Sequence, residues 1–311
     1  MSTLTLLGPQ TDSPTVGGVL EELGIKGKLG LITCGWEERE ELDSGELCAQ
    51  LPNETHNLRL FARFEEVLER DEPFFQALLD RNDRLRTMQR LYRKRLDHQL
   101  NAVWQLHTMS VPRMELLMPE RANSVYAVAR LDAHYVDRLR EIHSAFEDLW
   151  NPSERPVLVE IREQIAAETK DCEAILIAGG DVGVLIDRLR LFDMRRVLRR
   201  KNVIAWSAGA MSLAEQIVLF HDHPPQGKGN PEIYDDGLGL CPKVVLLPHA
   251  SARLDLDDRL RVKILASRFA PSTCVTLDPG CGIRWDGEVW TPFGRTRRLT
   301  KTGKVLGMLA P

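Results

Sequence analysis

The sequence has no long apolar run, no paired cysteines and no strong net charge. No window approaches 18 uninterrupted apolar residues, which argues against a membrane-spanning helix. The first ten residues, MSTLTLLGPQ, lack a positively charged start, so we expect no signal peptide. The six cysteines are scattered and form no CxxC pair, which favours reduced thiols over a disulfide framework. These absences predict a cytoplasmic protein with no membrane partner.

The charge balance and the apolar content describe an ordinary globular chain. The net charge of −4 over 311 residues gives no general reason to expect binding to nucleic acid. An apolar content of 43% and a charged content of 28% are typical of soluble globular proteins. We find no internal repeat and no low-complexity segment.

Two regions of the chain alternate short apolar runs with amphipathic helices, and a purely helical region separates them. Residues 1 to about 40 and 171–311 show the alternation, which indicates a mostly parallel sheet with helices on its faces. Residues 41–170 instead repeat apolar positions every three to four residues, which predicts long helices. We therefore predict a single α/β domain, a three-layer structure over 1–311, with a helical insertion at 41–170.

Two stretches of this pattern are rich in arginine. Residues 182–201 are predicted to form one helix with its arginines at the carboxyl end, where cations suit the helix dipole. The helical insertion carries a basic cluster: Arg84, Arg86, Arg90, Arg93, Lys94 and Arg95. We interpret this cluster as a solvated helix face, because no aromatic platform is interleaved with it, and we expect no nucleic-acid partner.

The segment NVIAWSAGAM contains a candidate nucleophile, Ser207. It follows an apolar strand and precedes small residues, a pattern that fits the small-x-Ser-x-Gly turn of hydrolases. Small neighbours are needed because such a turn is tight and its serine backbone is strained. A strand-to-helix junction without chemistry also fits this segment taken alone.

Two further segments supply groups that a nucleophilic serine needs. The strand AILIAGGD ends in two glycines, so the amides of Gly179 and Gly180, with that of Ala208, are candidate oxyanion donors. His249 follows the apolar run VVLLP and is expected at the same sheet edge as Ser207, where it can act as the base. The acid that orients His249 remains open among Asp222, Asp278 and Glu215. We expect no metal and no cofactor, since His221 and His223 lack the spacing of a third ligand.

Taken in order, AILIAGGD, VIAWSAGAM, GLGLCPKVVLLPHASARL and VTLDPGCGI resemble the dipeptidase E and cyanophycinase family of serine peptidases. The resemblance covers about residues 171–290 and, more weakly, the N-terminal strand–helix–strand. It implies a fold like that of the class I glutamine amidotransferases, with Ser207 as nucleophile and His249 as base. The sequence departs from the family at Pro279, where the family carries a glutamate, so either Asp278 or Asp222 supplies the carboxylate.

The resemblance also implies a small peptide substrate. Family members act on aspartyl or aspartate-derived peptides, so Arg253, four residues after the histidine, is expected to meet a substrate carboxylate, and Asp181 to line the same site. A salt bridge on a helix face is the alternative for Arg253. The rival functions are a catalytically inactive scaffold and, with less support, an esterase, because no histidine follows His249. The sequence leaves a homodimer open.

Overall fold

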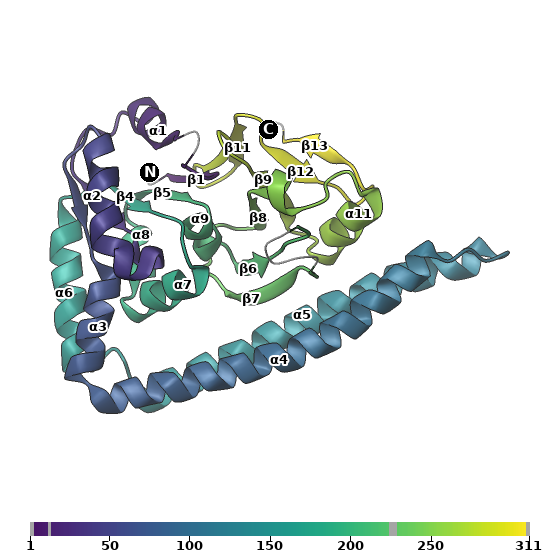
Figure 1. Ribbon diagram of the computed structural model, residues 1–311, viewed down its shortest axis with the longest axis horizontal. Coiled ribbons are helices and arrows are strands. Elements are labelled where there is room, and N and C mark those ends of the chain that lie inside the picture. Colours follow the sequence, from purple (N-terminus) through teal and green to yellow (C-terminus); the bar gives the residue numbers. More distant parts are fainter. Residues whose placement is uncertain (1–2, 12–13, 224–228, 309–311) are drawn as a thin grey trace.

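A computed structural model describes residues 3–11, 14–223 and 229–308. Its main sheet has seven strands (Figure 1), and β1, β5, β4, β2 and β3 run parallel, whereas β10 and β11 are antiparallel additions at one edge. In spatial order the strands are β11 (Trp290–Phe293), β10 (Gly282–Trp285), β1 (Leu4–Leu7), β5 (Asn202–Trp206), β4 (Ala174–Ile177), β2 (Leu29–Ile32) and β3 (Thr55–Asn57).

Successive side chains of these strands point to opposite faces of the sheet, and both faces are buried. Leu7, Leu176 and Ile204 pack on one face against helices α1 (Val16–Glu22) and α2 (Glu40–Gln50). The other face packs against a larger set of helices: α3 (Leu60–Arg70), α6 (Pro156–Lys170), α7 (Val182–Leu191), α8 (Met194–Leu198) and α9 (Ala208–Leu213). The predicted α/β fold, with a mostly parallel sheet between two layers of helices, is confirmed.

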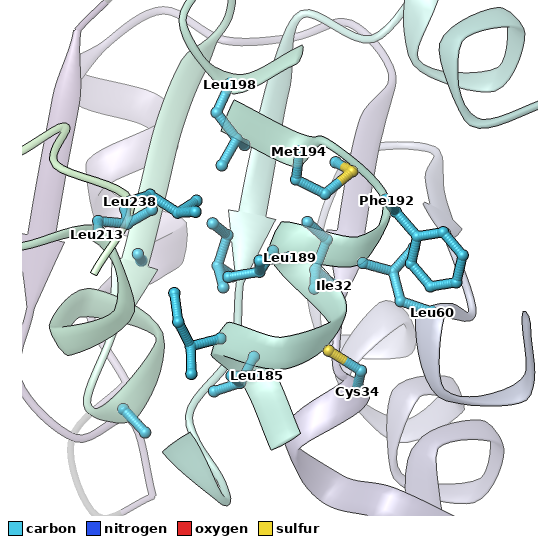
Figure 2. Packing of buried hydrophobic residues seen from close by; sticks show 14 of the residues in the cluster. Ile32, Cys34, Leu60, Leu185, Leu189, Phe192, Met194, Leu198, Leu213 and Leu238 are labelled. Atoms are coloured by element: carbon cyan, nitrogen blue, oxygen red, sulfur yellow. The ribbon is translucent and has the colours of Figure 1, made fainter. Parts of the chain in front are cut away.

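Helix α7 shows how the apolar pattern produces this layer. Leu185 and Leu189, four residues apart and fully buried, place one stripe of the helix toward the strands. Figure 2 shows both side chains within the cluster, together with Ile32 from β2 and Leu213 from α9. The prediction of one helix over 182–201 is wrong: Asp193, at φ 50°, separates α7 from α8.

A second, four-stranded sheet carries the C-terminal part of the fold. Its spatial order is β13 (Val305–Gly307), β12 (Arg297–Leu299), β9 (Thr273–Leu277) and β8 (Val244–Pro248). Beside it lie the hairpin β6 (Gln216–Leu219) and β7 (Glu232–Asp236), and the helices α10 (Ala250–Arg253) and α11 (Arg259–Arg268). The strands before Ser207 and His249, β5 and β8, thus belong to different sheets, which corrects the expectation of a single sheet edge.

Two 37-residue helices, α4 (Glu72–Thr108) and α5 (Met114–Trp150), pair along their length and form an arm that projects beyond the body (Figure 1). The Asp71 side chain caps α4 by accepting a hydrogen bond from the Phe74 amide at 3.2 Å. Asn151, in the left-handed conformation, ends α5. No helix of the described chain is long and apolar enough to cross a membrane. Most of the predicted helical region therefore forms this arm and the helices α2, α3 and α6, and only the short strand β3 interrupts it.

A buried polar cluster fastens the arm to the C-terminal sheet. The Arg268 guanidinium of α11 donates to both carboxylate oxygens of Asp132 at 2.6 and 2.8 Å and to the Tyr92 hydroxyl at 2.9 Å. The Tyr92 hydroxyl in turn donates to Asp132 at 2.7 Å. Nearer the base of the arm, Arg81 forms an ion pair with Asp187 of α7 at 3.2 Å. The arm is thus bonded to the helices that cover both sheets.

Candidate active site

A cavity of about 620 Å³ lies where β4, β5 and β8 end. The glycine loop, the candidate nucleophile and the candidate base all border it. Its walls include Gly179, Gly180, Asp181, Trp206, Ser207, Ala208, His249 and Arg253. The structure therefore brings together most of the residues singled out from the sequence, although they come from two sheets.

Ser207 has the backbone of a tight strand-to-helix turn. Its φ of 50° and ψ of −122° are rare for a residue other than glycine, so the surrounding contacts must hold the strained conformation. Gly209 explains the small residues that follow: a Cβ there would stand 2.5 Å from the carbonyl oxygens of Ile177 and Ala178. Ala208 opens α9, and its N–H lacks a partner within the helix because it belongs to the first turn. The candidate nucleophile and an amide that has no partner within its helix are therefore adjacent in the chain.

The glycine loop lies directly against this turn. Gly180 adopts φ +123°, a conformation that favours glycine, and a Cβ there would meet the Gly35 carbonyl oxygen at 2.2 Å. The Asp181 amide donates to the same carbonyl at 2.8 Å, and its carboxylate accepts from the Val184 amide at 2.9 Å, which caps α7. These bonds fix the loop beside Ser207.

Gly179 offers a test of how closely the loop and the nucleophile are fitted. A methyl group at this position would stand 2.9 Å from the Ser207 Cβ, so Gly179→Ala must displace the serine. We expect kcat for peptide hydrolysis to fall roughly 10- to 100-fold, the effect of a small misplacement of a reacting group. Gly17→Ala is the matched control, because a Cβ at Gly17 in α1 meets nothing within 4 Å. An unchanged kcat in Gly179→Ala would show that the loop does not hold the serine.

His249 begins the short helix α10, immediately after β8. It has φ 55° and ψ 33°, and its amide donates to the Leu277 carbonyl of the neighbouring strand β9 at 3.1 Å. This pairing turns the chain at the strand end, so that His249 borders the same cavity as Ser207. Each of the two residues thus occupies a left-handed or strained turn at the end of its own strand.

The candidate acids lie around the turn that starts at His249. The Asp278 carboxylate accepts from the Ser251 amide and hydroxyl, both at 2.8 Å, and from Arg297 at 3.1 Å. Asp222 lies at the other end of the turn, where its amide donates to the Arg253 carbonyl at 2.6 Å.

The Asp222 carboxylate, which is 4% exposed, forms an ion pair with Arg261 and accepts from the Asp255 amide at 2.9 Å. Glu215 is placed differently, since its carboxylate accepts from the Lys243 amide at 3.4 Å, before β8. Asp222 and Asp278 therefore both hold the segment that follows His249.

Arg253 borders the cavity and carries a positive charge. Partial burial lowers the pKa of its guanidinium below the usual value. No carboxylate in residues 3–11, 14–223 or 229–308 forms an ion pair with it, and this disfavours the salt-bridge alternative within the described chain. A guanidinium beside a cavity is suited to binding an anionic group.

Sequence reasoning missed an apolar wall of the cavity. Trp36 precedes α2 and Leu47 lies within it, while Leu219 ends β6 and Phe220 follows it. Nothing in the local pattern distinguishes these residues from ordinary core positions, because their role depends on how distant segments meet.

A serine on a strained turn, a glycine loop against it and a histidine bordering the same cavity are the arrangement of a serine hydrolase. The model of peptidase family S51 matches residues 125–291, and the chain belongs to that family. It is a serine peptidase, as the sequence motifs predicted.

Two of the solved structures that are similar to this chain are described as peptidases. One, from an acI-B1 actinobacterium, is 15% identical with a TM-score of 0.47, and the alignment covers 99% of this chain and 97% of that one. The other, a putative peptidase E from Listeria monocytogenes EGD-e, is 13% identical with a TM-score of 0.45, covering 96% and 100%. No curated protein matches the sequence.

Proposed function

We propose that this peptidase cleaves short peptides that carry a carboxylate near the scissile bond, with Ser207 as nucleophile and His249 as base. The observation that carries the proposal is that Ser207, His249, the glycine loop and Arg253, which forms no ion pair within the described residues, border a single cavity. Its volume of about 620 Å³ suits a dipeptide or a similarly small substrate.

In the proposed reaction, the Ser207 hydroxyl attacks the peptide carbonyl while His249 accepts its proton. The amides of Gly180 and Ala208, with Gly179 beside them, stabilise the oxyanion that forms. The tetrahedral intermediate collapses as His249 returns the proton to the leaving amine, and an acyl-enzyme remains. Water then attacks this ester with His249 as base, which releases the acid and restores Ser207.

The bonds around Asp222 and Asp278 support a positioning role for both carboxylates. Asp278 holds Ser251, two residues after His249, and Asp222 holds Arg253 and Asp255 farther along. Through these bonds each acid fixes the backbone turn that presents the imidazole. We propose that Asp222 contributes most to fixing this turn, because its side chain and that of its partner Arg261 are less exposed than Asp278 and Arg297.

The substrate preference follows from the charges at the cavity. Arg253 is proposed to bind the carboxylate of an aspartyl peptide, and Asp181, whose second carboxylate oxygen is not used by the helix cap, to bind an ammonium group. Trp36 and Leu47 leave an apolar wall for the remainder of the substrate.

Arg253→Met tests this assignment with paired substrates. We expect kcat/KM for Asp-Leu to fall roughly 10- to 100-fold, the range for a lost charge-assisted hydrogen bond, and kcat/KM for Asn-Leu to change little. Arg298→Met, an exposed arginine on β12, is the control and should leave both values unchanged. Equal losses on the two dipeptides would contradict recognition of a substrate carboxylate by Arg253.

A further inference from the structure

The face of the arm that points away from the body carries a groove between α4 and α5. Arg95 and Gln99 form its α4 side, and Ala127, Arg130 and His134 form its α5 side, around a hollow of about 370 Å³. One helical turn away on each helix are Leu91 and Tyr126, which are 56% and 61% exposed. We call these seven residues the arm groove.

The two arginines of the arm groove are not neutralised by the described part of the chain. Arg95, Arg130 and His134 form no ion pair with any residue in 3–11, 14–223 or 229–308. On the opposite face of the arm, Arg93 and Arg140 bond to Glu232 and Asp236 of the body. The groove is thus a basic, partly apolar surface on the face of the arm opposite the one that bonds to the body.

Positive charge is concentrated in the arm, and negative charge in the rest of the chain. Residues 84–130 contain nine lysines and arginines but three aspartates and glutamates, a net charge of +6. Because the whole chain carries −4, the remainder carries −10. The negative charge that could attract the positively charged arm is therefore present in the same polypeptide.

Helix α2 presents an exposed face of matching character. Glu41, Leu42, Gly45, Glu46 and Ala49 recur at helical spacing on its outward side. Leu42 is 77% exposed, and a Cβ at Gly45 would meet no atom within 4 Å, so another helix can approach closely. We call this the α2 stripe. Its glutamates and leucine are complementary in character to the arginines and apolar side chains of the arm groove; Glu46 forms no ion pair within the described residues, and Glu41 is paired with Arg59.

We propose that two copies of this chain associate through these surfaces, with the α2 stripe of each copy lying in the arm groove of the other. A reciprocal exchange of this kind closes with two-fold symmetry and yields a dimer. Apolar side chains on both surfaces favour a protein partner over nucleic acid, which is read by charge and by aromatic stacking. Since α2 also supplies Leu47 to the cavity wall, the arm of one copy borders the active-site entrance of the other.

Sedimentation equilibrium of the full chain tests the proposal without reference to peptidase activity. The wild type is expected to be a dimer whose dissociation constant rises with ionic strength. Arg95→Glu/Arg130→Glu is expected to raise that constant at least roughly 100-fold, since like charges then face each other across the interface. Arg196→Glu/Arg200→Glu, the same charge change at exposed positions on and just after α8, is the matched control and should leave it unchanged.

A compensating variant separates this contact from a general effect of charge. Adding Glu41→Arg/Glu46→Arg to Arg95→Glu/Arg130→Glu should restore the dimer. A monomeric wild type at 100 μM, or a dimer that survives Arg95→Glu/Arg130→Glu, would overturn the proposal. A monomer that shifts a 20-base-pair DNA duplex through the same two arginines would overturn it in favour of nucleic acid.

Discussion

Ser207→Ala is expected to reduce kcat/KM for dipeptide hydrolysis by roughly 10⁴-fold or more, as removal of a catalytic serine does elsewhere. The loss is expected in kcat, because the missing oxygen forms the covalent bond that splits the reaction into two steps. KM should change little, since Arg253 and the apolar wall that border the cavity remain. The fold should persist, because alanine removes a single oxygen atom from a side chain at the cavity wall.

Labelling with a fluorophosphonate probe gives an independent measurement. The wild type should label and Ser207→Ala should not, while Ser144→Ala, an exposed position on α5, should label like the wild type. Hydrolysis that survives Ser207→Ala would contradict the proposed mechanism. A wild type that neither labels nor cleaves any dipeptide would show that the serine is not activated.

Arg268→Met should destabilise the protein by about 3–5 kcal/mol, because Asp132 would remain buried without its counterion. The Arg268 side chain is 1% exposed and its guanidinium also bonds to Tyr92, so water cannot replace the lost contacts. Urea unfolding followed by circular dichroism measures the change. The arm should separate from α11 first, which increased protease cleavage within residues 92–132 would reveal.

The matched control is Arg140→Met, which breaks the ion pair with Asp236 on the same side of the arm. Arg140 is 60% exposed, so its loss should cost at most about 1 kcal/mol. The double variant Asp132→Leu/Arg268→Met should regain much of the lost stability, because it leaves no unpaired charge. Equal costs for Arg268→Met and Arg140→Met would indicate that the buried cluster does not hold the arm.

Local patterns in the sequence were sufficient to predict the main sheet. The runs that became β1, β2, β4 and β5 are apolar on both faces and bounded by glycine or by helix signals, so their burial follows from composition. The break at Asp193 was missed because the apolar spacing continues across it, and a single left-handed residue is enough to redirect the helix. The division into two sheets was missed because the sequence of a strand does not reveal which other strands pair with it.

The residues of the site could be predicted from local patterns, but the way in which they meet in space could not. Ser207 and the glycine loop are adjacent because β4 and β5 pair directly, and neighbouring parallel strands bring their carboxyl ends together. His249 approaches from another sheet, and the acids around it bond to backbone amides and arginines far along the chain. Such bonds follow from tertiary packing, which no spacing of residue types encodes.

The arm gives the two halves of the site a common mechanical support. Ser207 ends a strand of one sheet and His249 a strand of the other, while Arg81 bonds to a helix on the first sheet and Asp132 to a helix on the second. A long helix pair that is anchored at both points restricts rotation of one sheet against the other. The arm thus joins the helix layer behind Ser207 to the helix layer behind His249 through one ion pair to each.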